Sequence, residues 1–97
     1  MILKLIVSPQ AREDLFDIWF YIAEDSTINA DRFTGKIVKK YEWLTENSEA
    51  GVKCDDLLPG LRSFPYAKYM LYYRIKNSTL ELVRILHGSR DLGLVFH

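Results

Sequence analysis

One short stretch of the chain gathers residue types that could perform acid–base chemistry. In the sequence VRILHGSRD, His87 follows an apolar run, and Ser89, Arg90 and Asp91 come within the next four positions. Histidine is the side chain whose usual pKa lies closest to neutral pH, so His87 is a candidate general base. The alternative is structural: His87 ends a strand, and Arg90 pairs with Asp91 after a turn at Gly88.

The reaction that these residue types fit best is metal-independent cleavage of RNA. It requires a base near the 2′-hydroxyl, an acid for the leaving oxygen and cations around the phosphate. The candidates for this reading are His87, Arg62, Arg84 and Arg90. A second acid or base is not evident, because tyrosine titrates at about pH 10. The structural alternative is therefore favoured, and no catalytic residue is assigned.

Metal chemistry is not indicated by the spacing of the possible ligands. A zinc or transition-metal site needs several ligands that converge, usually in closely spaced pairs. No phosphate-binding glycine loop surrounds Gly88 either. We therefore expect no metal and no cofactor. The possible ligands are Cys54, Asp55, Asp56, His87 and His97.

Length and composition indicate one small globular domain, residues 1–97. Of the 97 residues, 48% are hydrophobic, which is enough for a packed core. With a single cysteine, Cys54, the chain forms no internal disulfide, and the first apolar run is interrupted at Lys4. We expect a cytoplasmic protein without a membrane span.

Charge is divided unevenly along the chain. Up to Gly60 there are 7 basic and 11 acidic residues, whereas from Leu61 onward there are 6 basic and 2 acidic ones. The basic second part is a candidate surface for phosphate, RNA or an acidic partner. Ordinary surface charge explains it equally well.

Hydrophobic periodicity predicts an α+β fold with the order β-α-α-β-β-β. Ser8-Pro9 is typical of a helix start, and Ser26 or Thr27 can cap the second helix. Short loops favour an antiparallel helix hairpin on one face of a mostly antiparallel sheet. The predicted strands cover residues 2–7, 61–66, 69–75 and 80–87, and the predicted helices residues 9–24 and 28–47.

The first helix carries more apolar surface than one sheet contact needs. Leu15, Ile18 and Ile22 form one stripe, and Phe16 and Phe20 form a second stripe beside it. The second stripe either packs on the other helix or binds a partner.

Alternation along the strands predicts which side chains face the helices. On the third strand these are Leu71 and Tyr73, and on the fourth they are Val83, Ile85 and His87. Leu82 is then expected on the opposite face. That face would be partly basic and partly apolar, with Tyr72, Arg62, Arg74 and Arg84.

The segments LLPGLRSFPYAKYMLYYRI and LELVRILHGSRDLGLVF resemble the ParE branch of the RelE/ParE toxins, which belong to bacterial type II toxin–antitoxin systems. The segment SPQAREDLFDIWFYIAED is similar to the first helix of that family. The resemblance implies the β-α-α-β-β-β fold, a cognate ParD-like antitoxin in a hetero-oligomer, and a role in plasmid stabilisation. It also implies inhibition of DNA gyrase, whereas RelE-like members cleave mRNA on the ribosome.

Two groups of site residues follow from this interpretation. The antitoxin is expected to bind an apolar groove and an adjoining basic surface, at Phe16, Trp19, Phe20, Trp43, Arg62, Arg74 and Arg84. In the ParE branch the C-terminal segment is implicated in target inhibition, which implies Arg90, Asp91, Leu92, Leu94, Val95 and Phe96.

The sequence therefore favours a gyrase inhibitor that is not itself an enzyme. The alternatives are a RelE-like, ribosome-dependent mRNA endonuclease and an inactive homologue that still binds antitoxin. The nuclease would be preferred if His87 and two arginines converged on an open, anion-sized hollow with a second titrating side chain opposite.

Overall fold

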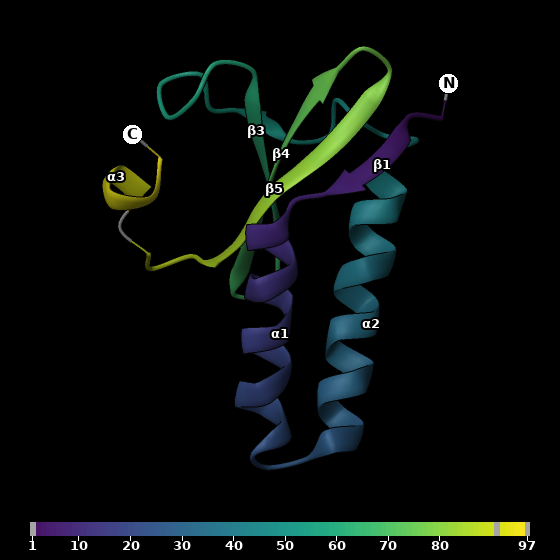
Figure 1. Ribbon diagram of the computed structural model, residues 1–97, viewed down its shortest axis with the longest axis vertical. Helices are drawn as coiled ribbons and strands as arrows, with labels where there is room; N and C mark the ends of the chain where they lie inside the picture. Colours follow the sequence, from purple (N-terminus) through teal and green to yellow (C-terminus); the bar gives the residue numbers. More distant parts are fainter. Residues whose placement is uncertain (1, 91, 97) are drawn as a thin grey trace.

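A computed structural model describes residues 2–90 and 92–96 of the chain. Two helices form a hairpin that covers one face of a sheet, and a short third helix follows the last strand (Figure 1). The elements are β1 (Lys4–Val7), α1 (Pro9–Ala23), α2 (Thr27–Leu44), β2 (Val52–Lys53), β3 (Leu61–Tyr66), β4 (Tyr69–Lys76), β5 (Thr79–His87) and α3 (Leu92–Val95).

The sheet confirms the predicted α+β class. Its strand order is β1-β5-β4-β3-β2, with β1 parallel to β5 and all other neighbours antiparallel. The structure adds two short elements, β2 and α3, to the predicted order. Pro65 lies on the part of β3 beyond β2, where an edge residue needs no second ladder bond. None of the described helices is long and apolar enough to cross a membrane.

Both long helices begin where the sequence predicts. The Ser8 hydroxyl accepts the Ala11 N–H at 3.0 Å, and Pro9 occupies the first turn. The Ser26 hydroxyl accepts the Asn29 N–H at 3.1 Å, so Ser26 is the cap of α2 and Thr27 is its first residue. The helices end at Ala23 and Leu44, slightly before the predicted ends.

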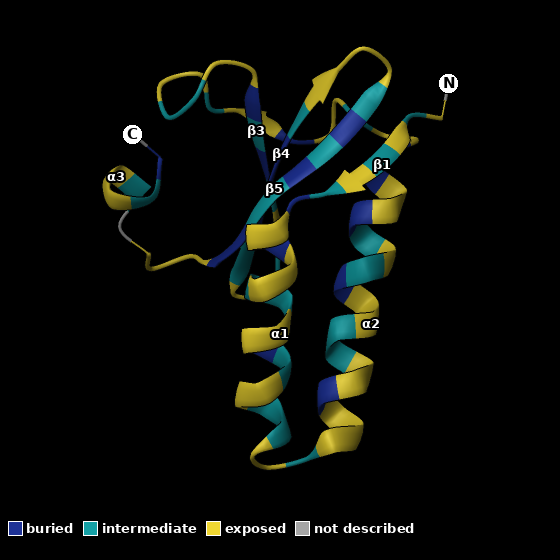
Figure 2. Cartoon of the chain, in the orientation of Figure 1, coloured by how far each residue is buried: buried dark blue, intermediate teal, exposed yellow. Residues whose placement is uncertain are grey.

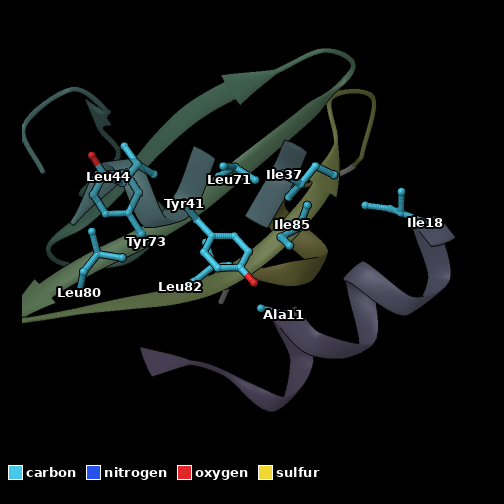
Figure 3. Close-up of a cluster of buried hydrophobic side chains, with 10 residues drawn as sticks. All are labelled: Ala11, Ile18, Ile37, Tyr41, Leu44, Leu71, Tyr73, Leu80, Leu82 and Ile85. Carbon is cyan, nitrogen blue, oxygen red and sulfur yellow. The ribbon is translucent and has the colours of Figure 1, made fainter. Parts of the chain in front are cut away.

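The main core lies between the helix hairpin and the sheet (Figure 3). Ile37 and Leu44 of α2 pack with Leu71 and Tyr73 of β4, and all four are fully buried. Burying side chains of this size supplies most of the hydrophobic stabilisation of a small domain. The predicted helix-facing positions on β4 are therefore confirmed for Leu71 and Tyr73.

A second apolar cluster covers the opposite face of the sheet. Leu61, Tyr72 and Leu86 are buried there beneath Phe96, which follows α3. The C-terminal segment lies on that side of the sheet, away from the helix hairpin, with Phe96 among the buried positions (Figure 2). The expected exposed surface around Tyr72 is therefore wrong, because only 3% of Tyr72 is accessible.

A β-bulge corrects the predicted faces of β5. Tyr72 pairs with Arg84 and Tyr73 pairs with Leu82, so Val83 is an extra residue between them. As a result Leu82 belongs to the helix-side core and Val83 to the opposite cluster, which reverses both assignments. Beyond the bulge the alternation recovers, and Ile85 faces the helices as predicted.

Candidate functional site

An apolar groove lies between α1 and α2. Its hollow has a volume of about 380 Å³. Phe16 and Phe20 remain 63% and 60% exposed on its α1 side, although both are large apolar side chains. Such a patch on a small domain is typical of a protein-binding surface. The lining residues are Val7, Arg12, Leu15, Phe16, Trp19, Phe20, Thr34 and Tyr41.

The aromatic side chains of the groove hold one another in place. The Trp19 ring meets Phe20 edge-on, with centroids 5.3 Å apart, and Phe16 and Phe20 stack at 6.3 Å. The Trp19 Nε1–H donates to Asp31 Oδ1 at 2.7 Å and so joins α1 to α2. A row of aromatic side chains ordered before binding loses little conformational entropy when a partner docks.

Trp43 lies apart from the other predicted antitoxin contacts. Its ring packs on Phe64 of β3 at 5.6 Å, and Lys40 Nζ lies 4.8 Å from the Trp43 centroid. It lines a separate, more polar hollow with Leu3 and residues 46–50. The structure thus brings together Phe16, Trp19 and Phe20, but not Trp43.

The three arginines expected on the sheet each have an acceptor within the chain. Arg62 Nη1 donates to the Gly51 carbonyl at 2.8 Å, and Arg74 Nε donates to Glu81 at 2.7 Å. Arg84 binds Asp14, and hydrogen bonding to that carboxylate raises the pKa of the Arg84 guanidinium. Arg74 and Arg84 are therefore paired with carboxylates, whereas Arg62 binds a backbone carbonyl.

His87 lies at a third hollow, of about 180 Å³, where α1 meets the end of β5. The Ser89 backbone N–H donates to His87 Nδ1 at 3.2 Å, and the Ser89 hydroxyl lies 2.7 Å from the same nitrogen. Because a backbone N–H can only donate, a neutral His87 carries its proton on Nε2. The ring also meets Tyr69 edge-on at 5.6 Å.

The charges around the His87 hollow do not suit a phosphate. Arg90 lines it, but so do the carboxylates of Asp14 and Asp17. Burial, with a smaller contribution from Tyr21, raises the pKa of Tyr69 above its ordinary value of 10.0. Tyr69 is thus a poor partner for acid–base catalysis at neutral pH. Of the two arginines sought beside His87, only Arg90 reaches this hollow.

The C-terminal segment is divided between buried and exposed side chains. Phe96 is 9% exposed and packs on Tyr72, with centroids 5.0 Å apart, while Leu92 and Val95 are half-buried in the same cluster. Leu94 is 75% exposed, and Arg90 is exposed as well. Asp91, also predicted to act on the target, lies outside the described residues.

Within residues 2–90 and 92–96, no three His, Cys, Asp or Glu side chains converge as metal ligands. The Cys54 thiol contacts the Ser63 hydroxyl at 3.3 Å, and Asp55 accepts the Gly60 N–H at 2.8 Å. His97, the other histidine considered, lies outside the described residues. Through these contacts Cys54 and Asp55 stabilise the loop between β2 and β3.

Two features of the site were missed by the sequence analysis. Arg12, Thr34 and Tyr41 line the groove. The helical spacing of Thr34 and Tyr41 is a signal that could have placed them on one face. Asp14, the partner of Arg84, is 70 residues away in the chain, and no local pattern indicates that pairing.

Comparisons with known proteins agree with the observed fold. The family model of the ParE toxin of the type II toxin–antitoxin system parDE matches residues 5–92. A solved structure of the chromosomal ParDE system from P. aeruginosa is similar with a TM-score of 0.75 and 22% identity, covering 89% of this chain and 96% of that one. The toxin–antitoxin complex RelBE2 from Mycobacterium tuberculosis is similar with a TM-score of 0.70 and 21% identity, covering 90% and 99%. No curated protein sequence matches significantly.

Proposed function

The chain belongs to the ParE toxin family of type II toxin–antitoxin systems, and from this membership we propose that it inhibits DNA gyrase and is neutralised by a cognate antitoxin. Inhibition of gyrase blocks replication, and the antitoxin prevents this by forming a hetero-oligomer with the toxin. Gyrase and the antitoxin are both cytoplasmic, and so is the toxin. The single observation that carries the proposal is the preformed aromatic groove between α1 and α2, because it provides a protein-binding surface.

The antitoxin binds this groove through an amphipathic helix. Phe16, Trp19 and Phe20 are the central contacts, because aromatic side chains in a desolvated groove dominate such interfaces. Trp43 contributes only if the antitoxin also reaches the end of α2. An acidic antitoxin segment would have to compete for the guanidinium groups of Arg62, Arg74 and Arg84, since each already has an acceptor.

The gyrase contact lies in the segment from Arg90 to Phe96. Leu94 is the apolar side chain that this segment presents to solvent, and Arg90 adds an exposed positive charge beside it. Phe96, Leu92 and Val95 hold the segment against the sheet. The toxin acts by binding alone, because Arg62, Arg74 and Arg84 are committed to structural contacts and two carboxylates line the hollow beside His87.

A supercoiling assay tests this function directly. Purified toxin added to gyrase and relaxed plasmid should inhibit supercoiling and increase cleaved DNA. Prior mixing with the product of the reading frame adjacent to the toxin gene should restore activity. If the toxin leaves gyrase unaffected and its expression alone is harmless to cells, the chain is an inactive homologue and the proposal fails.

A second candidate, ribosome-dependent mRNA cleavage, is favoured by one observation: His87, Arg90 and Tyr69 line a common hollow. Translating ribosomes should show new mRNA ends when the toxin is added, and His87→Ala should abolish them. A matched control is Ser89→Ala, which removes the hydroxyl beside His87 Nδ1 but leaves the ring. Intact mRNA together with inhibited gyrase excludes this alternative.

A further inference from the structure

The middle of α2 contains a glycine that the chain's own packing does not require. Gly35 lies within the 18-residue helix, and a Cβ atom built on it would meet nothing within 4 Å apart from its chain neighbours and the backbone of its own helix. Glycine is the poorest helix former after proline, because it loses the most backbone entropy on folding. The free protein would therefore be more stable with alanine at this position.

Gly35 stands on the face of α2 that borders the antitoxin groove. Asp31, Gly35, Val38 and Glu42 follow the helical spacing of one face. Asp31 Oδ1 accepts the hydrogen bond from Trp19, which lines the groove, so this face flanks it. Gly35 is exposed next to Thr34, which lines the groove, and the space that a side chain at position 35 would occupy is open.

We propose that Gly35 is the point of closest approach between the toxin and the antitoxin helix, and that a bulky apolar side chain of the antitoxin sits over it. This inference rests on the proposed function and names a residue that determines specificity within the same site. Residues without a side chain let another backbone or a large side chain come close to a helix axis. The glycine therefore selects antitoxins that carry a bulky residue at the facing position.

The occupant is an antitoxin helix rather than a second toxin copy for two reasons. The chain belongs to a toxin–antitoxin family, and the similar solved structures are ParDE and RelBE2 systems. The groove also runs between two antiparallel helices, which is the geometry that accommodates a third helix.

The proposal predicts effects of opposite sign on stability and on binding. Gly35→Ala should raise the Tm of the free toxin by about 4 to 8 °C, as expected for a favourable helix substitution in a domain of this size. The same change should weaken binding of the adjacent-gene product about tenfold, and Gly35→Leu should weaken it by about a hundredfold, because a close contact tolerates no added volume.

Two controls separate this inference from the proposed function. Lys36→Leu adds volume at the neighbouring exposed position, beside Ile22 and Phe33 and outside the groove, and should leave binding unchanged. If Phe16→Ser and Phe20→Ser weaken binding but Gly35→Leu does not, the groove holds the antitoxin and the role of Gly35 is refuted. If none of these variants weakens binding, the proposed antitoxin groove itself fails. A change in the toxin's own oligomeric state on Gly35→Leu, with antitoxin affinity unchanged, assigns the face to a second toxin copy and also overturns the proposal.

Discussion

Asp14 and Arg84 form a bidentate ion pair that closes the open edge of β5. Arg84 Nε lies 2.8 Å from Asp14 Oδ2, and Arg84 Nη2 lies 2.9 Å from Asp14 Oδ1. The same carboxylate accepts the Ile85 N–H at 2.9 Å. Because β1 ends at Val7, opposite Leu82, no strand pairs with β5 at Ile85 on the β1 side. A side chain of α1 thus replaces the missing strand.

Removing this carboxylate should destabilise the fold. Asp14→Ala leaves both the Arg84 guanidinium and the Ile85 N–H without their acceptor, and we expect a loss of about 2 to 3 kcal/mol in the free energy of unfolding. Urea denaturation measures it. Asp17→Ala, on an exposed position of the same helix, should change stability by about 0.5 kcal/mol or less. Equal losses for the two variants would refute the role of Asp14.

Substitution of the groove aromatics should separate binding from stability. Phe16→Ser and Phe20→Ser should each weaken antitoxin binding by about 2 kcal/mol, roughly thirtyfold, as expected for central aromatic contacts. Because both side chains are more than half exposed, the free energy of unfolding should barely change. Titration calorimetry with the adjacent-gene product gives the affinities. Tyr21→Ser serves as the control, since Tyr21 is 73% exposed but does not line the groove.

Leu94 of α3 and Phe96, which follows the helix, should respond differently to mutation. Leu94→Ala should reduce gyrase inhibition without affecting stability, because Leu94 is 75% exposed. Phe96→Ala should lower the free energy of unfolding by about 2 to 3 kcal/mol, below the full cost of a central phenylalanine, because Phe96 packs near the end of the chain. It should also speed labelling of Cys54, which packs in the same cluster and is the single thiol. Unchanged inhibition by Leu94→Ala would remove this segment from the gyrase contact.

Stability should fall in alkaline solution because of the buried tyrosines. Burial raises the pKa of Tyr73 above its ordinary value of 10.0, outweighing the opposing effects of the Gly51 N–H and Arg62. Since the folded pKa exceeds the unfolded one, stability is fully present below about pH 10 and is lost as pH rises through the folded pKa.

The variant Tyr73→Phe should flatten this alkaline decline. At neutral pH it should cost about 1 to 2 kcal/mol, because the hydroxyl accepts the Gly51 N–H at 2.8 Å and donates to the Ser48 carbonyl at 2.7 Å. Thermal unfolding between pH 7 and 11 measures both effects.

Local patterns predicted the elements of the fold well. The caps at Ser8 and Ser26 and the turn before Tyr69 depend on a few neighbouring residues, which is why the sequence indicates them. Alternation correctly placed Leu71, Tyr73 and Ile85. It placed Leu82 and Val83 on the wrong faces, because a bulge depends on the fit between two strands and leaves no local signal.

The candidate site was predicted only in part, for a related reason. Phe16 and Phe20 form a second apolar stripe on α1, so their spacing alone indicated an apolar surface in excess of the core. Whether Trp43 joins them depends on how α2 packs on β3, and that packing directs Trp43 to Phe64. The partners of Arg62, Arg74 and Arg84 likewise come from other elements or from the neighbouring strand.

The sequence by itself determined the fold class, the helix starts, the wide apolar face of α1 and the family resemblance, because each of these follows from residues that are close together in the chain. Only the tertiary structure decided which arginines are free to bind, which tyrosines are buried and which part of the C-terminal segment faces solvent. Those properties depend on contacts such as Asp14 with Arg84 and Phe96 with Tyr72, which join residues far apart in the chain. Such contacts form only once the sheet and helices have packed together.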